Sequence, residues 1–180
     1  VKINISLTNL ADIAAVDNVY STFFPDTVIA RAVNYLPART VTMVSGLPMG
    51  ALVQIEAVVS HGDGTPPQAV EDRHGIVIKA NNTEQAPIDS LSTQTVAFSH
   101  YNHLSGQLPI NPKTGKLIDG DIKAQTQQCL ENIKAIAESI DHKMDDIVKV
   151  TIQLKDIRDI GTVNDVYATF FDGDLPARTV

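Results

Sequence analysis

The chain contains an internal repeat, and this repeat limits the folds that it can adopt. Residues 1–24 (VKINISLTNLADIAAVDNVYSTFF) and 148–171 (VKVTIQLKDIRDIGTVNDVYATFF) match at 12 of 24 positions without a gap. The pentapeptide PARTV follows each copy, at 37–41 and 176–180, and the first copy has eight extra residues before it. We therefore expect two similar units in tandem. Because a strand pattern stands at both chain ends, we also expect a piece of a longer tandem protein.

Each copy of the repeat has the pattern of a strand followed by a helix. Apolar and polar residues alternate from Val1 to Leu7 and from Val148 to Leu154, which is the period of a half-buried strand. Asp12 and Asp159 are then placed to cap helices whose apolar residues recur every three or four positions. A different helix, with one apolar stripe, is predicted once, from about Asp121 to Ile140.

The remaining segments predict a linker and further strands. The tract HGDGTPPQAVEDRH, residues 61–74, is rich in Gly, Pro and charge and is predicted to be a linker. It separates residues 1–60, the C-terminal half of a first unit, from residues 75–180, a second unit that lacks its last strands. The order of elements predicts an α+β fold, a two-layer sandwich with a mixed sheet and two helices on one face per unit. The further strands are predicted at 39–44, 51–59, 75–80, 93–98 and 101–105.

Composition excludes several classes of protein. Apolar residues make up 43% of the chain and charged residues 19%, which is enough to form a substantial core. The net charge of -7, without clustered Lys and Arg, argues against nucleic acid as a partner. Apolar runs stay shorter than the roughly 20 residues of a membrane span, so we expect no membrane partner. The single cysteine, Cys129, is typical of a reducing compartment, and we expect a cytoplasmic location.

Three motifs in order resemble the Rid (YjgF, reactive intermediate deaminase) family. They are SGQ-P-NP-TG at 105–115, VN-VY-FF at 163–171 and PAR at 176–178. The first copy repeats the later motifs and adds LPMGALVQIEAVV, which resembles the closing strand of the family. The resemblance implies a chorismate-mutase-like fold, a trimer or pseudo-trimer with clefts between subunits, and no cofactor or metal. It also implies hydrolysis of 2-imino or 2-enamino acids to 2-oxo acids and ammonia.

The resemblance also implies roles for single residues. Arg39 and Arg178 match the arginine that holds the carboxylate of the substrate, and the fixed fork of a guanidinium suits this task. Ser105 and Gly106 would offer a hydroxyl and a backbone N–H to the reacting carbon or to a water. Asn164 would supply an amide near the cleft, although its counterpart in the first copy is Asp17. Taken alone, these residues also fit an exposed ion pair, a plain turn and a solvent-facing amide.

Two positions depart from the family pattern, namely Gln54 and Ser92, and Ser92 stands where the family often has a tyrosine ahead of Gln94. Gln54 stands where the family has a glutamate that positions the attacking water, and an amide can orient a water but cannot take its proton. Glu56 shares a sheet face with Gln54 by the two-residue period, so it is either a partial substitute or a solvent-facing charge. Two functions stay open: a deaminase in which Ser105, Gln54 and Glu56 act on the substrate, or a weakened module that binds small carboxylates as a sensor. A ribonuclease ranks third, because paired histidines with a basic groove are missing from the sequence.

The two incomplete units contain complementary elements. Residues 1–60 include the strands at 39–44 and 51–59, whereas the second unit supplies the first strands and the long helix. We expect the pieces to complete each other, within one chain or between chains. The strand and helix of Val1 to Phe24 would then be surplus and the less well ordered copy.

Overall fold

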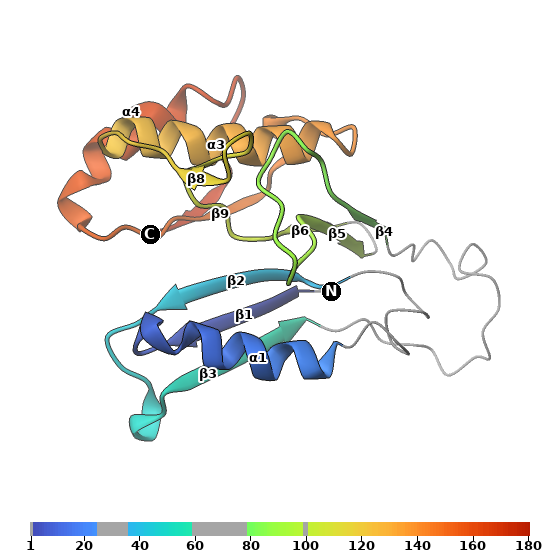
Figure 1. Cartoon of the computed structure of the whole chain (residues 1–180). Coiled ribbons are helices and arrows are strands. Elements are labelled where there is room, and N and C mark those ends of the chain that lie inside the picture. The colour runs from blue at the N-terminus through green and yellow to red at the C-terminus, as the bar shows by residue number, and fades with distance from the viewer. Residues whose placement is uncertain (1, 25–35, 59–78, 99–100) are drawn as a thin grey trace. The chain divides into compact units, whose positions relative to one another are not determined.

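The computed structural model describes two compact units of the chain (Figure 1). The described residues are 2–24, 36–58, 79–98 and 101–180. Unit 1 comprises Val1–Asn82 and Ile88–Gly106, and unit 2 comprises Thr83–Pro87 and Gln107–Val180. The predicted linker at 61–74 lies outside the described residues. The compact units therefore differ from the divisions 1–60 and 75–180, because strands after the linker fold together with the first copy of the repeat.

Unit 1 has one described helix on a mixed sheet. Its elements are β1 (Lys2–Leu7), α1 (Ile13–Phe23), β2 (Ala38–Met43), β3 (Val53–Val58), β4 (Lys79–Asn81), β5 (Thr95–Phe98) and β6 (Tyr101–Leu104). Strand β1 lies between β2, to which it is parallel, and β3, to which it is antiparallel. Helix α1 packs on this sheet, where Ile5, Leu7 and Tyr20 are buried. The mixed α+β architecture and the strand predicted from Val1 to Leu7 are thus confirmed.

The central place of β1 corrects the expectation that Val1 to Phe24 is surplus. Ile5 pairs with Val41 on one side and with Ile55 on the other, and its side chain is fully buried. Removing β1 would leave the backbone groups of two neighbouring strands without partners. The expectation was wrong because the first copy of the strand forms the middle of a sheet.

A second sheet of unit 1 joins the first sheet through β2. Strands β4, β5 and β6 pair antiparallel in this order. The backbone N–H of Gly106 donates to the carbonyl of Arg39 at 3.0 Å, and that of Thr93 donates to the carbonyl of Pro37 at 3.3 Å. Strands from both sides of the predicted linker therefore belong to one compact unit, whereas the long helix belongs to the other.

Unit 2 contains the long helix and the second copy of the repeat. Its elements are β7 (Ile110–Asn111), β8 (Lys116–Leu117), α3 (Ile122–Glu138), β9 (Lys149–Thr151), α4 (Ile160–Ala168) and β10 (Ala177–Thr179). Leu130 of α3 packs with Val166 and Tyr167 of α4 in a buried cluster. Strands β9 and β10 are parallel, as β1 and β2 are in unit 1. In the described parts of both units, every helix is too short or too polar to cross a membrane.

The repeated helices begin where the sequence predicted, but their N-cap side chains do not make the capping bonds. Asp12 and Asp159 occupy the N-cap positions, but neither side chain makes a capping hydrogen bond. A 3₁₀ turn precedes each helix, and the caps stand three residues earlier, where the side chains of Asn9 and Asp156 accept backbone N–H bonds. The predicted N-cap positions are thus confirmed, but the capping hydrogen bonds stand three residues earlier, because the tighter turn moves the first unpaired N–H groups toward the N-terminus.

Candidate functional site

Arg178 on β10 of unit 2 is exposed and is oriented by helix α4. Its Nη1 donates to Oδ1 of Asn164 at 2.7 Å, and its guanidinium carbon lies 5.2 Å from the centre of the Tyr167 ring. Residues three apart lie on the same side of a helix, so α4 presents both contacts to the arginine. Within the described chain, no acid pairs with Arg178, so its charge remains available to a carboxylate.

Arg39 on β2 of unit 1 occupies the equivalent position, but its guanidinium is buried and paired with an acid. Its guanidinium carbon lies 4.8 Å from the centre of the Tyr20 ring, which repeats the arrangement in unit 2. Here, however, the guanidinium forms an ion pair with the carboxylate of Asp17, and the side chain of Arg39 is only 5% exposed. The two predicted carboxylate-binding arginines therefore differ: one is open to solvent, and the other is buried and neutralised.

Both tyrosines beneath the arginines are neutral phenols. Burial raises the pKa of Tyr20 to about 12, against an opposing effect of the Arg39 guanidinium. Burial likewise raises the pKa of Tyr167, again opposed by its arginine, Arg178. Tyr20 and Tyr167 are among the apolar residues that recur along the two repeated helices, and the sequence alone predicted no role for them. The signal was present, because the dipeptide VY precedes PAR in both copies.

Ser105 and Gly106 fasten β2 to the end of β6. The buried hydroxyl of Ser105 donates to the carbonyl of Thr93 at 2.7 Å and accepts the backbone N–H of Arg39 at 2.8 Å. The N–H of Gly106 also lies 3.1 Å from the hydroxyl oxygen of Thr40, and a Cβ at Gly106 would lie 2.9 Å from the Thr40 methyl. A side chain at position 106 would therefore require the Thr40 side chain to shift. A catalytic hydroxyl at Ser105 would first have to give up one of these bonds.

Gln54 and Glu56 lie on β3 of unit 1 and share a sheet face, as predicted. Both side chains are exposed, and Nε2 of Gln54 lies 3.4 Å from Oε1 of Glu56. Glu56 pairs with Asn4, whereas Arg39 pairs with the adjacent residue, Ile3. Because neighbouring residues of a strand point to opposite faces, the sheet separates this polar pair from Arg39.

The predicted site residues thus fall into two units. Unit 1 brings Arg39, Ser105 and Gly106 together, and it holds Gln54 and Glu56 on the opposite face of the sheet. Unit 2 contains the other two predicted residues, which contact each other directly, namely Arg178 and Asn164. Cys129, also in unit 2, is unsuited to act as a nucleophile, because burial raises the pKa of its thiol to about 11.

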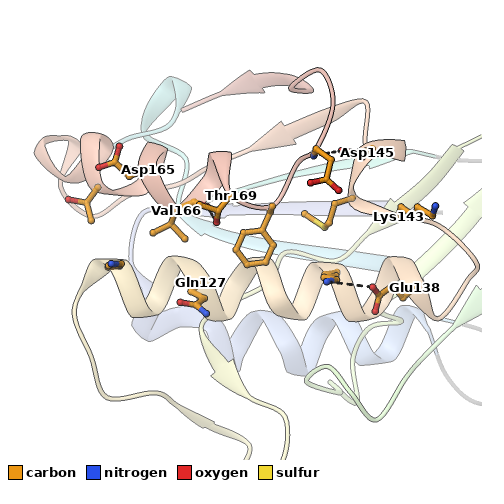
Figure 2. A pocket seen from close by; sticks show the side chains of 13 residues that line it. Gln127, Glu138, Lys143, Asp145, Asp165, Val166 and Thr169 are labelled. Carbon is orange, nitrogen blue, oxygen red and sulfur yellow. Dashed lines mark hydrogen bonds and ion pairs between the residues drawn. The ribbon is translucent and has the colours of Figure 1, made fainter.

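A groove of about 790 Å³ runs between α3 and α4 in unit 2 (Figure 2). Its floor contains apolar atoms of Met144, Val166 and Phe170. Side chains of both charge signs line it, and one pair among them, Lys134 and Glu138, forms an ion pair at 3.8 Å. Mixed charges on long exposed side chains do not select a charged ligand. The lining of this groove includes neither Arg178 nor Asn164, so we do not assign it to the candidate site.

Comparison with known proteins identifies the family. The family model described as Endoribonuclease L-PSP matches residues 83–180. The chain therefore belongs to this family, whose solved members include Rid and YjgF proteins.

Individual relatives agree with this assignment. A RutC family protein of Pyrococcus horikoshii is 47% identical over 98 residues, which cover 53% of this chain and 77% of that protein. A 2-iminobutanoate/2-iminopropanoate deaminase of Rattus norvegicus is 36% identical over 104 residues, or 57% of this chain and 76% of that protein. The YjgF gene product from E. coli, known from a crystal structure, is 42% identical in sequence, and the TM-score between the two structures is 0.53. The match covers 56% of this chain and 82% of that chain.

Proposed function

We propose that this protein hydrolyses small 2-imino and 2-enamino acids to 2-oxo acids and ammonia. The observation that carries the proposal is Arg178, an exposed guanidinium that Asn164 and Tyr167 orient and that no described acid neutralises. Such substrates carry a carboxylate next to a planar C=N bond, and a guanidinium fork binds a carboxylate in a defined plane. The relative from Rattus norvegicus that is named as a 2-iminobutanoate/2-iminopropanoate deaminase supports this choice of substrate.

The reaction needs little from the protein beyond orientation and a proton acceptor. Water adds its oxygen to C2 of the imine and a proton to the nitrogen, and the resulting carbinolamine releases ammonia as its C–N bond breaks. Holding the carboxylate fixes the face of C2 that the water attacks, which lowers the entropic part of the barrier. Glu56 is an exposed carboxylate able to take the proton of the water, and Gln54 beside it is able to orient the water.

The proposal includes assembly of several copies, as a trimer or pseudo-trimer, in the cytoplasm. The resemblance to the Rid family supports this proposal, because it implies clefts between subunits. The elements of the site lie in separate units of this chain, Arg178 in unit 2 and Glu56 in unit 1.

A second candidate function is the binding of small carboxylates without turnover. Gln54 favours it, because an amide has no basic state at this position. The same arginine would then hold a 2-oxo acid, and the protein would act as a sensor or regulator. The test is the decay of 2-iminopropanoate, generated enzymatically in the assay and followed by pyruvate and ammonia release. Faster decay with the protein present is the result that the deaminase proposal requires, whereas pyruvate binding without faster decay favours the binding module.

Replacing Gln54 by glutamate is expected to raise the rate of pyruvate release severalfold. Two neighbouring carboxylates repel each other, so the pKa of one of them rises toward neutrality and it becomes a better proton acceptor. The matched control is Gln127→Glu on α3, because Gln127 likewise donates to a glutamate, Glu131, at 2.9 Å. An unchanged rate in a folded Gln54→Glu variant would show that a proton acceptor at this position does not limit the reaction.

A further inference from the structure

The two copies of the repeat carry aspartate and asparagine in opposite order. The first copy reads Asp17-Asn18 and the second reads Asn164-Asp165, within the motifs VDNVY and VNDVY. The residue that contacts the arginine is the first of the pair in both units. An exchange of two neighbouring residues thus gives one arginine an acidic partner and the other a neutral one.

The surroundings of Arg39 have the features of a site that is already filled. The side chain of Arg39 is 5% exposed and that of Asp17 is 28% exposed, so the carboxylate covers the guanidinium on the side that faces solvent. Within the described chain, the Nε of Arg39 and the hydroxyl of Tyr20 are both buried without a hydrogen-bond partner. Buried polar groups are usually paired, so two donors without a partner beside one ion pair leave hydrogen-bonding capacity unused at this site.

We propose that unit 1 holds a second carboxylate-binding site, built like that at Arg178, which the side chain of Asp17 fills in place of a ligand. The proposal rests on the proposed function only in the choice of ligand, a small monocarboxylate such as a 2-oxo acid. A carboxylate tethered on the neighbouring helix has an effective concentration of about millimolar or more, so a weakly bound metabolite does not displace it. Each chain then has one open site, at Arg178, and one latent site, at Arg39.

Reciprocal exchanges of the contact residues test this proposal in the full chain. Asp17→Asn gives Arg39 the partner that Arg178 has, and Asn164→Asp gives Arg178 the partner that Arg39 has. Asn18→Asp and Asp165→Asn are the controls. The first adds a charge, as Asn164→Asp does, and the second removes one, as Asp17→Asn does, and both change an exposed residue. Pyruvate is the probe, and its binding is measured by calorimetric titration.

We expect Asn164→Asp to weaken pyruvate binding about tenfold or more, a loss of about 1.4 kcal/mol. In an Arg178→Ala background, which removes the open site, we expect Asp17→Asn to create one new pyruvate site per chain. The control variants should do neither. If Asp17→Asn unfolds unit 1, Asp17→Ala replaces it, and acetate should then raise the melting temperature of that variant, because it restores the missing carboxylate.

A folded Asp17→Asn or Asp17→Ala chain, without Arg178, that binds neither pyruvate nor acetate would overturn the proposal. The gain of binding is scored in the absence of Arg178, so it does not depend on the deaminase proposal. One outcome would contradict the proposed function and still support the latent site. In it, the wild-type protein does not bind pyruvate, whereas the Asp17→Asn chain without Arg178 does.

Discussion

Replacing Arg178 by alanine is expected to lower the rate of 2-oxo acid release by at least about 100-fold. The reason is the loss of two charge-assisted hydrogen bonds to the substrate carboxylate, each worth about 1.5–3 kcal/mol, and about 1.4 kcal/mol corresponds to a factor of ten in rate. The fold should survive, because the side chain of Arg178 is exposed and its contacts are limited to the surface of α4. The measurement is pyruvate release from enzymatically generated 2-iminopropanoate.

Two further variants show whether the rate depends on the planar guanidinium of Arg178 or only on its charge. Arg178→Lys keeps the charge but loses the fork, so we expect an intermediate rate. Arg158→Ala removes another exposed arginine of unit 2, which pairs with Asp156, and should leave the rate unchanged. A folded Arg178→Ala variant that is as fast as the wild type would remove this arginine from the mechanism.

Replacing Ile5 by alanine is expected to destabilise unit 1 by about 2–5 kcal/mol. Ile5 is fully buried in the middle strand of the sheet, against Tyr20 and Leu7, and the shorter side chain would leave a cavity there. Amide hydrogen exchange in β2 is the measurement, because it reports on unit 1 without requiring that both units unfold together. A loss of 2 kcal/mol corresponds to exchange about 30-fold faster.

The matched control for this variant is Ile55→Ala. Ile55 lies directly opposite Ile5 on β3, but its side chain is 57% exposed, so we expect a loss of less than about 1 kcal/mol. Equal effects of the two substitutions would contradict the central position of β1. So would a deletion of residues 1–24 that leaves the exchange in β2 unchanged.

Local patterns predicted most of the elements of this fold. The alternation from Val1 to Leu7 and the apolar stripe after Asp121 gave a strand and a helix close to the observed bounds, because both depend on short-range periodicity. The N-cap positions were predicted correctly, but the 3₁₀ turn before each helix was missed, since a three-residue turn has almost no periodicity to detect. The β7 and β8 hairpin was missed, because each of its strands has only two residues.

The partners of the candidate site residues were harder to predict. The hydroxyl of Ser105 accepts a hydrogen bond from the backbone N–H of Arg39, which is 66 residues away in the sequence. Local sequence patterns do not predict a contact over that separation. The sequence analysis marked Asp17 as a difference from Asn164, but the consequence depends on which arginine each residue faces. Asp17 carries a carboxylate where Asn164 carries an amide, and hydrophobic periodicity does not distinguish these two side chains.

The most direct test of the account follows the side-chain N–H groups of the two arginines in the wild-type protein. Pyruvate has a C=O bond where the substrate has C=N, so it occupies a carboxylate site without reacting further. During a titration with pyruvate, the account predicts a saturable shift of the Nε–Hε resonance of Arg178 and an unchanged resonance of Arg39. A shift at Arg39 with none at Arg178 would contradict it, and so would a titration in which neither resonance moves.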